Sequence, residues 1–325
     1  MLDSVGHISR VEGAVLGAAI GDAMGHPTEF LGHDEIRRRF PPDGVEGYEL
    51  WWEGDRGRFA PYTDDTQMAE IVLRSLVRSR ASGSDLDATM EDIAAGFREW
   101  LVRPQGGHRA PGNACMAGAR ALTRGAHWSE AGGATAGGCG SVMRAYPFGI
   151  VFADDPVKAE RWAVEHSKLT HRDPIALAAC AAMACAMCAA VAGEDVERIL
   201  AVMPEAAGRY DTRTAEMIER AIADGLSGAA PDDVLRRLEG WAAHEAIAAA
   251  AFVVARHPED ARRAILEGAN AHGDSDSIAT LAGAVLGARH GIGALPGDWV
   301  RDVERSDELR ALAGEASRAA GSRRA

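Results

Sequence analysis

The chain has 325 residues, and 47% of them are hydrophobic, which is enough apolar material for a sizeable buried core. Basic residues number 35 against 48 acidic ones, a net charge of −13, so an extended nucleic-acid surface is not expected. Aromatic residues make up only 6%, and alanine supplies much of the apolar fraction, which favours helices over strands.

The first predicted element is a helix over Val11–Ile20, an apolar run rich in alanine and glycine. Gly25 and Pro27 are expected to end this helix, because neither residue supports its continuation. Asp22 then lies near the helix end, where a supporting role is preferred over metal ligation. Glu29 lies in the loop that follows.

Residues 41–61 contain proline, glycine and two tryptophans, and they are expected to form a long loop with little regular structure. This loop leads to Tyr62–Gln67, which reads YTDDTQ, so that two adjacent carboxylates are flanked by hydroxyl groups. An apolar run with helical spacing follows, and the carboxylates are therefore predicted to open a helix.

Further helices are predicted at 85–101 and 115–122, with a loop at 103–113 between them. The glycine-rich passage 132–144 comes next, and its backbone N–H groups could hold a phosphate. The passage matches neither the P-loop nor the dinucleotide-binding fingerprint, so a flexible connector is an equal alternative at this point.

Thr170–Pro174 is typical of a helix start, with Asp173 as the N-cap and Pro174 at the first helical position. The run Ile175–Ala192 is long and uncharged enough to raise the question of a membrane span. Alanine dominates this run and makes it too weakly hydrophobic for that role. We therefore predict a buried central helix and no association with a membrane.

The five cysteines do not indicate a disulfide framework. Cys185 and Cys188 form a CxxC pair, but no second pair completes a zinc site, so small core residues are the better interpretation. The N-terminus lacks a basic region followed by an apolar core, which argues against a signal peptide. A reducing, cytoplasmic location is predicted.

The remaining predicted helices are at 194–202, 212–225, 231–238, 241–255 and 258–268. No alternating strand pattern, fixed repeat or domain linker is found, which predicts one all-α domain. Residues 1–314 are assigned to this domain, and residues 315–325 are expected to be a short tail that can fray. The protein is expected to be a monomer.

A second oxygen-rich cluster occurs in Asn270–Ser277, where Asp274 and Asp276 are followed by the hydroxyl of Ser277. Aspartate, serine and glycine also form turns and helix caps, and that reading stands for either cluster alone. Two distant clusters that each open a helix instead favour a site for one or two hard divalent cations, which prefer oxygen ligands.

Five segments together resemble the ADP-ribosylglycohydrolase family, which includes the dinitrogenase-reductase-activating glycohydrolase and the ADP-ribosyl-acceptor hydrolases. They occur in the family's order within residues 11–300, and they are Gly21–Glu29, Thr63–Thr66, Gly138–Arg144, Thr170–Pro174 and Gly273–Ser277. The resemblance implies an all-α helical bundle with a central cleft for two Mg²⁺ or Mn²⁺ ions. It also implies cleavage of the bond between C1″ of ADP-ribose and an acceptor, which releases ADP-ribose.

The resemblance also assigns roles to individual residues. The implied metal ligands are Thr63, Asp64, Asp65, Asp274, Asp276 and Ser277. Glu29 and Asp65 are the implied catalytic carboxylates, which could take a proton from the attacking water. Gly140, Ser141 and Met143 match the loop that holds the diphosphate and ribose, and His171 matches a substrate-facing histidine.

Three positions depart from the family pattern. Ser277 stands where threonine is frequent and keeps the hydroxyl, whereas Cys139 replaces an asparagine and loses its amide. His272 replaces a small residue. Cys139 and His272 put substrate preference in doubt, and the acceptor itself (arginine, serine, a nucleobase or a metabolite) is not readable from the sequence. A non-catalytic ADP-ribose-binding relative and a dimetal phosphohydrolase are the alternatives.

Overall fold

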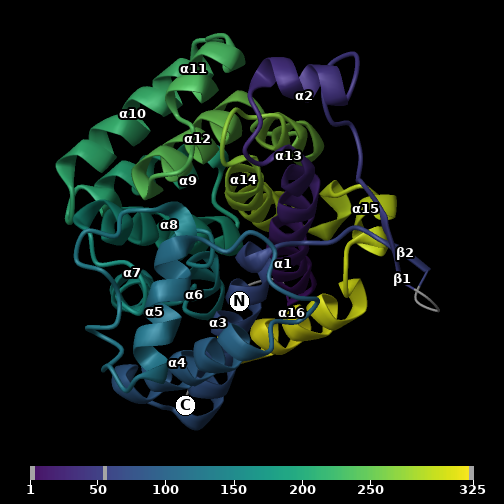
Figure 1. Ribbon diagram of the computed structural model, residues 1–325. Coiled ribbons are helices and arrows are strands. Elements are labelled where there is room, and N and C mark those ends of the chain that lie inside the picture. Colours follow the sequence, from purple (N-terminus) through teal and green to yellow (C-terminus); the bar gives the residue numbers. More distant parts are fainter. Residues whose placement is uncertain (1–3, 54–56, 322–325) are drawn as a thin grey trace.

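The computed structural model describes residues 4–53 and 57–321. Within these residues the chain is built almost entirely from α-helices, as predicted, with one short hairpin (Figure 1). The elements of the first half are α1 (Ser4–Gly25), α2 (His33–Arg39), β1 (Trp51–Glu53), β2 (Gly57–Phe59), α3 (Asp64–Ser82), α4 (Leu86–Val102), α5 (Asn113–Thr123), α6 (Tyr146–Val151) and α7 (Pro156–Ser167). Those of the second half are α8 (Pro174–Ala192), α9 (Val196–Ala207), α10 (Thr212–Leu226), α11 (Pro231–Arg237), α12 (Ala243–Arg256), α13 (Ala261–Ala269), α14 (Ser275–His290), α15 (Gly297–Asp302) and α16 (Ser306–Gly321).

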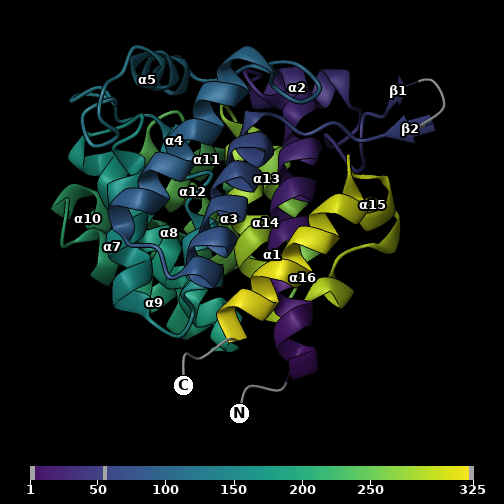
Figure 2. The same cartoon turned by 90° about the horizontal axis from the view of Figure 1, so that it is seen from below.

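The centre of the molecule is an antiparallel pair of helices, α1 and α14, that pack along a seam of glycines (Figures 1 and 2). A Cβ atom at Gly17 would overlap the carbonyl oxygen of Gly283, and a Cβ at Gly13 would overlap that of Gly287. At the end of α1, a Cβ at Gly25 would lie 2.5 Å from the Cα of Asp276. The absence of side chains lets the two backbones approach closely, which brings the end of α1 against the first turn of α14.

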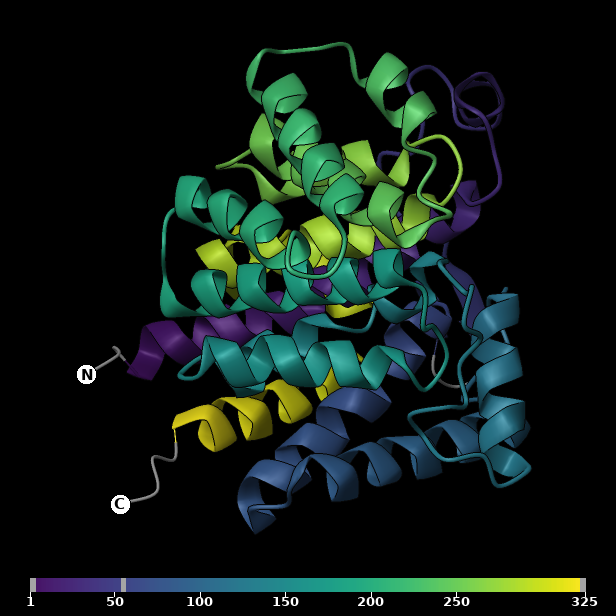
Figure 3. The same ribbon diagram turned by 90° about the vertical axis from the view of Figure 1, so that its left-hand side faces the viewer.

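The other helices surround this pair in layers. Figure 3 shows the green helices α10–α12 and the blue helices α3 and α4 on opposite sides of the molecule, with α1 and α14 between them. The helix α8 packs against α6, α7, α9, α12 and α14. By length and composition α8 could cross a membrane, but 72% of its apolar stretch is buried inside the protein. It is therefore the buried central helix that its alanine-rich sequence predicts.

Local signals explain the start of the helices that matter most for the cleft described below. The hydroxyl of Thr63 accepts a hydrogen bond from the backbone N–H of Asp65, which caps α3. Asp173 caps α8 in the same way, with Pro174 in the first turn, as predicted. The helix α1 ends at Gly25, also as predicted.

The segment 41–61 has little regular structure, as predicted, and its residues 51–53 pair with 57–59 as a short antiparallel hairpin that projects from the body (Figures 1 and 2). Two other features of the secondary structure differ from expectation. Helices α2, α6, α7, α15 and α16 were not predicted. Residues 315–321, which the sequence assigned to a short tail, form the last turns of α16, where Ala316 and Ser317 are buried. Residues 322–325 lie outside the described residues.

Candidate functional site

The two oxygen-rich clusters meet at one cleft of about 370 Å³. Three carboxylates and a hydroxyl from the ends of two helices line it: Asp64 and Asp65 from α3, and Asp276 and Ser277 from α14. Carboxylates are stabilised at helix N-termini, where the backbone N–H groups carry partial positive charge. The remaining lining residues are Glu29, Phe30, Ala110, Pro111, Gly112, Asn113, Ala114, Cys115, Gly138, Cys139, Gly140, Met143, His171, Trp241 and Asp274.

Direct hydrogen bonds join the clusters across more than 200 residues of sequence. The hydroxyl of Ser277 donates to Asp65 Oδ2 at 2.9 Å, and the hydroxyl of Thr63 donates to Asp276 Oδ2 at 3.5 Å. The six residues implied as metal ligands are therefore within one buried group, although Thr63 lies behind the cleft surface.

Asp22 supports this group from below and is itself fully buried. Its Oδ1 accepts from the backbone N–H of Thr63 at 2.9 Å. Its Oδ2 accepts from the backbone N–H and the hydroxyl of Thr66, at 2.9 Å and 2.6 Å. Asp22 thus ties the last turns of α1 to the first turn of α3, in agreement with a supporting role. Its position does not line the cleft.

The carboxylates of the cleft strongly perturb one another. Burial raises the pKa of Glu29 to about 10, and the neighbouring carboxylates, first Asp276, add to the rise. Burial and Asp276 raise the pKa of Asp22 to about 7. The same two causes hold the pKa of three further carboxyl groups well above its usual range: Asp64, Asp65 and Asp274.

The donor chemistry of this cluster fits a hard divalent cation. None of these carboxylates forms an ion pair with a basic side chain of the described residues. Crowded carboxylates of this kind are the oxygen ligands that Mg²⁺ and Mn²⁺ prefer. No three His, Cys, Asp or Glu side chains of the described chain are already arranged as ligands of a metal ion, and Asp65 instead accepts a hydrogen bond from Ser277.

The glycine-rich passage forms another wall of the cleft, through the short 3₁₀ helix Cys139–Ser141. The Cys139 thiol donates to Asp274 Oδ2 at 2.7 Å. Gly140, Met143 and His171 line the cleft. Ser141 does not: its side chain is fully buried and accepts a hydrogen bond from Ser167 at 2.9 Å. Any contact of Ser141 with a ligand would therefore have to come from its backbone.

Sequence reasoning missed an aromatic pair at the cleft. The rings of Phe30 and Trp241 stack with centroids 5.1 Å apart and an interplanar angle of 17°. Phe30 is 63% exposed and has a φ of 69°, a left-handed conformation that is strained for a bulky residue. Trp51 and Trp52, which the sequence made conspicuous, lie instead on the hairpin. No sequence signal distinguished Trp241.

The loop between α4 and α5, which lines part of the cleft, is tethered by polar contacts. The guanidinium of Arg109 donates to the backbone carbonyl of Tyr62 and forms a buried ion pair with Glu304 at 2.5 Å. The amide of Gln67 donates to the carbonyls of Gln105 and Gly107. These contacts hold Ala110–Asn113 beside the start of α3.

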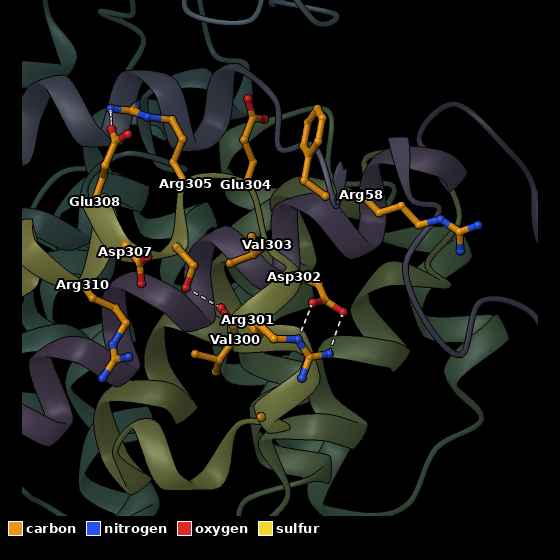
Figure 4. A pocket seen from close by; sticks show the side chains of 13 residues that line it. Arg58, Val300, Arg301, Asp302, Val303, Glu304, Arg305, Asp307, Glu308 and Arg310 are labelled. Atoms are coloured by element: carbon orange, nitrogen blue, oxygen red, sulfur yellow. Dashed lines mark hydrogen bonds and ion pairs between the residues drawn. The ribbon is translucent and has the colours of Figure 1, made fainter. Parts of the chain in front are cut away.

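A separate surface hollow of about 550 Å³ lies near α15 and α16 (Figure 4). Several of its charged side chains are paired: Arg301 pairs with Asp302 at 2.7 Å, and Arg305 pairs with Glu308 and Glu70. Because arginines are interspersed with its carboxylates, this hollow is a weaker candidate for chemistry than the cleft, whose carboxylates have no basic partner among the described residues.

Comparison with known proteins identifies the class of this helical fold, in which a buried carboxylate cluster opens two helices. The family model for ADP-ribosylglycohydrolase matches residues 3–325, so the chain belongs to the ADP-ribosylglycohydrolase family. It is an enzyme that hydrolyses ADP-ribose linkages.

Named relatives extend over nearly the whole chain. The chain is 28% identical to the ADP-ribosyl-[dinitrogen reductase] glycohydrolase of Rhodospirillum rubrum, covering 94% of this chain and 97% of the relative. It is 28% identical to the ADP-ribosylarginine hydrolase Tri1 of Pseudomonas putida (95% and 78% covered) and 26% identical to human ADP-ribosylhydrolase ARH3 (94% and 92% covered). A solved "ADP-ribosylglycohydrolase-related protein complex" superposes with a TM-score of 0.70 at 27% identity, over 97% of this chain and 99% of that one.

Proposed function

We propose that this enzyme uses two divalent cations, Mg²⁺ or Mn²⁺, to hydrolyse the bond between C1″ of ADP-ribose and an acceptor side chain, with ADP-ribosylated arginine of a protein as the first candidate. The observation that carries the proposal is the meeting of Thr63–Asp65 with Asp274–Ser277, joined by the 2.9 Å hydrogen bond between Ser277 and Asp65. The name of the Pseudomonas relative supports arginine as the acceptor, and the name of the Rhodospirillum relative supports a modified protein as the substrate.

The reaction adds water across the glycosidic bond. Positive charge grows on the ribose as the acceptor leaves, and the acceptor departs with a proton. The metals would be held by Thr63, Asp64, Asp65, Asp274, Asp276 and Ser277, and when bound they would supply Lewis-acid contacts that orient the ribose hydroxyls and a water.

The side chains of the cleft would do the remaining work. Glu29 or Asp65 would take the proton of the attacking water as its oxygen bonds to C1″. The backbone at Gly140 and the side chains of Met143 and His171 would hold the diphosphate and ribose. The raised pKa of Glu29 belongs to the crowded carboxylates without a cation, and a nearby cation would lower it, so that Glu29 can act as a base.

A panel of arginine-, serine- and nucleic-acid-linked ADP-ribose, each with Mg²⁺, with Mn²⁺ and with a chelator, tests the proposal. We expect free ADP-ribose from the arginine-linked substrate and no turnover with the chelator. Release of AMP or inorganic phosphate would contradict the proposal and indicate a phosphohydrolase. Turnover that persists in the chelator would contradict the metal requirement.

A further inference from the structure

Arg144 is a fully buried cation whose guanidinium makes no ion pair with a carboxylate of the described chain. Burial of a charge is costly unless hydrogen bonds compensate for the lost water. The side chain lies against the ring of Phe97, 4.7 Å from its centroid, and it donates to the backbone carbonyl of Gly140. Two further donations, to His166 Nε2 at 3.1 Å and to Thr170 Oγ1 at 2.5 Å, complete its principal contacts.

These contacts constrain the hydrogen positions of His166 and Thr170, because a guanidinium can only donate hydrogen bonds. His166 Nε2 must accept from Arg144, so the proton of that ring is on Nδ1, which donates to the carbonyl of Ala163 at 3.0 Å. The hydroxyl oxygen of Thr170 also accepts from Arg144. Its own hydrogen is therefore free to point at His171 Nδ1, 2.7 Å away.

The hydroxyl hydrogen of Thr170 has no other acceptor among the described residues. This arrangement favours the tautomer of His171 whose Nδ1 accepts from Thr170 and whose ring proton is on Nε2. The Nε2 atom has no hydrogen-bond partner in the described chain. The ring lines the cleft beside the glycine-rich passage, where a Cβ atom at Gly140 would lie 3.4 Å from Nε2 and one at Gly138 would lie 3.5 Å away.

We propose that Arg144 is a positioning residue, which fixes His171 through Thr170 as a neutral Nε2–H donor for an oxygen of the substrate's diphosphate. It also fixes the Gly140 peptide on the same wall of the cleft. The inference rests on the proposed function for the identity of the ligand, but the tautomer of His171 is a property of the protein alone. Neither Arg144 nor Thr170 lines the cleft, so both act through neighbours.

The ionisation of His171 agrees with this role. Burial, with a smaller contribution from Arg144, lowers the pKa of His171 to about 3. The uncharged hydroxyl of Thr170 contacts Nδ1 of the ring, and Arg144 is the charged group that contributes to the lowered pKa of His171. The carboxyl groups of the same cleft face the ring from α3 and α14. His171 should therefore stay neutral, with its donor in place, across the pH range in which enzymes of this kind work.

The test uses variants of Thr170, because removal of the buried Arg144 could prevent folding. Thr170→Val keeps the side-chain shape but removes the hydroxyl that links Arg144 to His171, and Thr170→Ser restores a hydroxyl. Thr280→Val is the matched control: Thr280 is fully buried, its hydroxyl has no partner, and it lies outside the cleft. ¹⁵N spectra of labelled histidines report the tautomer of His171, and calorimetry reports binding of ADP-ribose.

We expect the Nε2–H tautomer of His171 in the wild type, in Thr170→Ser and in Thr280→Val, and a mixed or Nδ1–H tautomer in Thr170→Val. The Kd for ADP-ribose should rise about tenfold in Thr170→Val, since one oriented hydrogen bond to a charged group is lost. It should change little in the other two variants.

Three results would overturn the inference. The first is an Nδ1–H or protonated His171 in the wild type at neutral pH, which decides the matter even if Thr170→Val does not fold. The second is a Thr170→Val protein with unchanged tautomer and affinity. The third is a wild type whose His171 has the expected tautomer but which does not bind ADP-ribose. That result would refute the role in binding and, separately, the proposed function.

Discussion

At the scale of single residues, the cleft concentrates negative charge and supports it with hydrogen bonds. Asp65 accepts from the hydroxyl of Ser277, and Asp22 accepts three hydrogen bonds from the first turn of α3. These bonds orient the carboxylates, but they do not neutralise them. Replacing an implied metal ligand such as Asp65 should therefore affect turnover and stability differently from replacing the implied base Glu29.

The first prediction concerns the implied ligands. Asp65→Ala or Asp276→Ala should abolish detectable turnover, because each removes oxygen ligands from both the metal site and its hydrogen-bond network. The metal-free variants should be at least as stable as the wild type, since carboxylate repulsion is relieved. Turnover and thermal unfolding on the same preparations check this, with Asp307→Ala on α16 as the control. Near-wild-type turnover in either variant would refute the proposed metal site.

The second prediction separates Glu29 from the ligands. Glu29 follows Gly25 and Pro27 in a loop and is only partly buried. Glu29→Gln keeps its shape and loses its base, so turnover should fall by about 10²–10⁴-fold, with a smaller change in ADP-ribose affinity. Steady-state kinetics and calorimetry measure the two quantities. Unchanged turnover would make Glu29 a structural residue, and lost metal binding would make it a ligand.

At the scale of elements, the glycine seam between α1 and α14 decides where the site forms. The seam continues from Gly13 and Gly17 to Gly25, whose Cα lies against the first turn of α14. This close approach brings Asp22 near Asp276, close enough for Asp276 to raise the pKa of Asp22. A separation of the two helices would therefore disturb the cleft as well as the core.

The third prediction tests the seam. Gly17→Ala would force its new methyl group into the backbone of Gly283, so it should lower the free energy of unfolding by about 1–3 kcal/mol or more and weaken metal binding. Gly314→Ala in α16 is the control, because its Cβ would meet only the end of Arg318 at 3.5 Å. It should be stabilising by about 0.5–1 kcal/mol. Denaturant unfolding compares the two, and equal stabilities would contradict the seam.

At the scale of the whole molecule, the buried carboxylates make stability depend on pH and on cations. A carboxyl whose pKa is higher in the folded than in the unfolded protein binds more protons when folded. Its contribution to stability is greatest at low pH and is lost as the pH rises through the folded pKa. For Asp22 that pKa is about 7, and for Glu29 it is about 10. The metal-free protein should therefore lose this contribution between about pH 4 and these values.

The fourth prediction follows from competition between protons and cations. Mg²⁺ or Mn²⁺ at millimolar concentration should raise the Tm more at about pH 8 than at about pH 6, because at lower pH protons occupy the same carboxylates. Thermal unfolding with and without the cation at both pH values measures the difference. In Asp276→Ala the effect should largely disappear. A cation effect that is larger at the lower pH would contradict the proposed site.

The sequence by itself determined the features that depend on neighbours along the chain. Alanine content and helical spacing indicated an all-helical protein, and Asp173 with Pro174 marked the start of α8. The five motifs indicated the family, which the family model confirms. The assigned ligands and substrate contacts remain predictions, although most of these residues lie in or against one cleft. These signals are readable because capping, periodicity and motif order are local properties.

Only the tertiary structure decided what depends on packing between distant segments. The burial of Ala316 and Ser317 at the end of α16 requires partners far along the chain, since α16 packs against α1 and α3. The position of Ser141 behind the cleft, the Phe30–Trp241 pair and the unpaired burial of Arg144 have no signal in sequence. The physical reason is that the close packing of helices such as α1 and α14 decides which side chains are buried and which distant residues lie together. That packing is a property of two surfaces together, not of either segment alone.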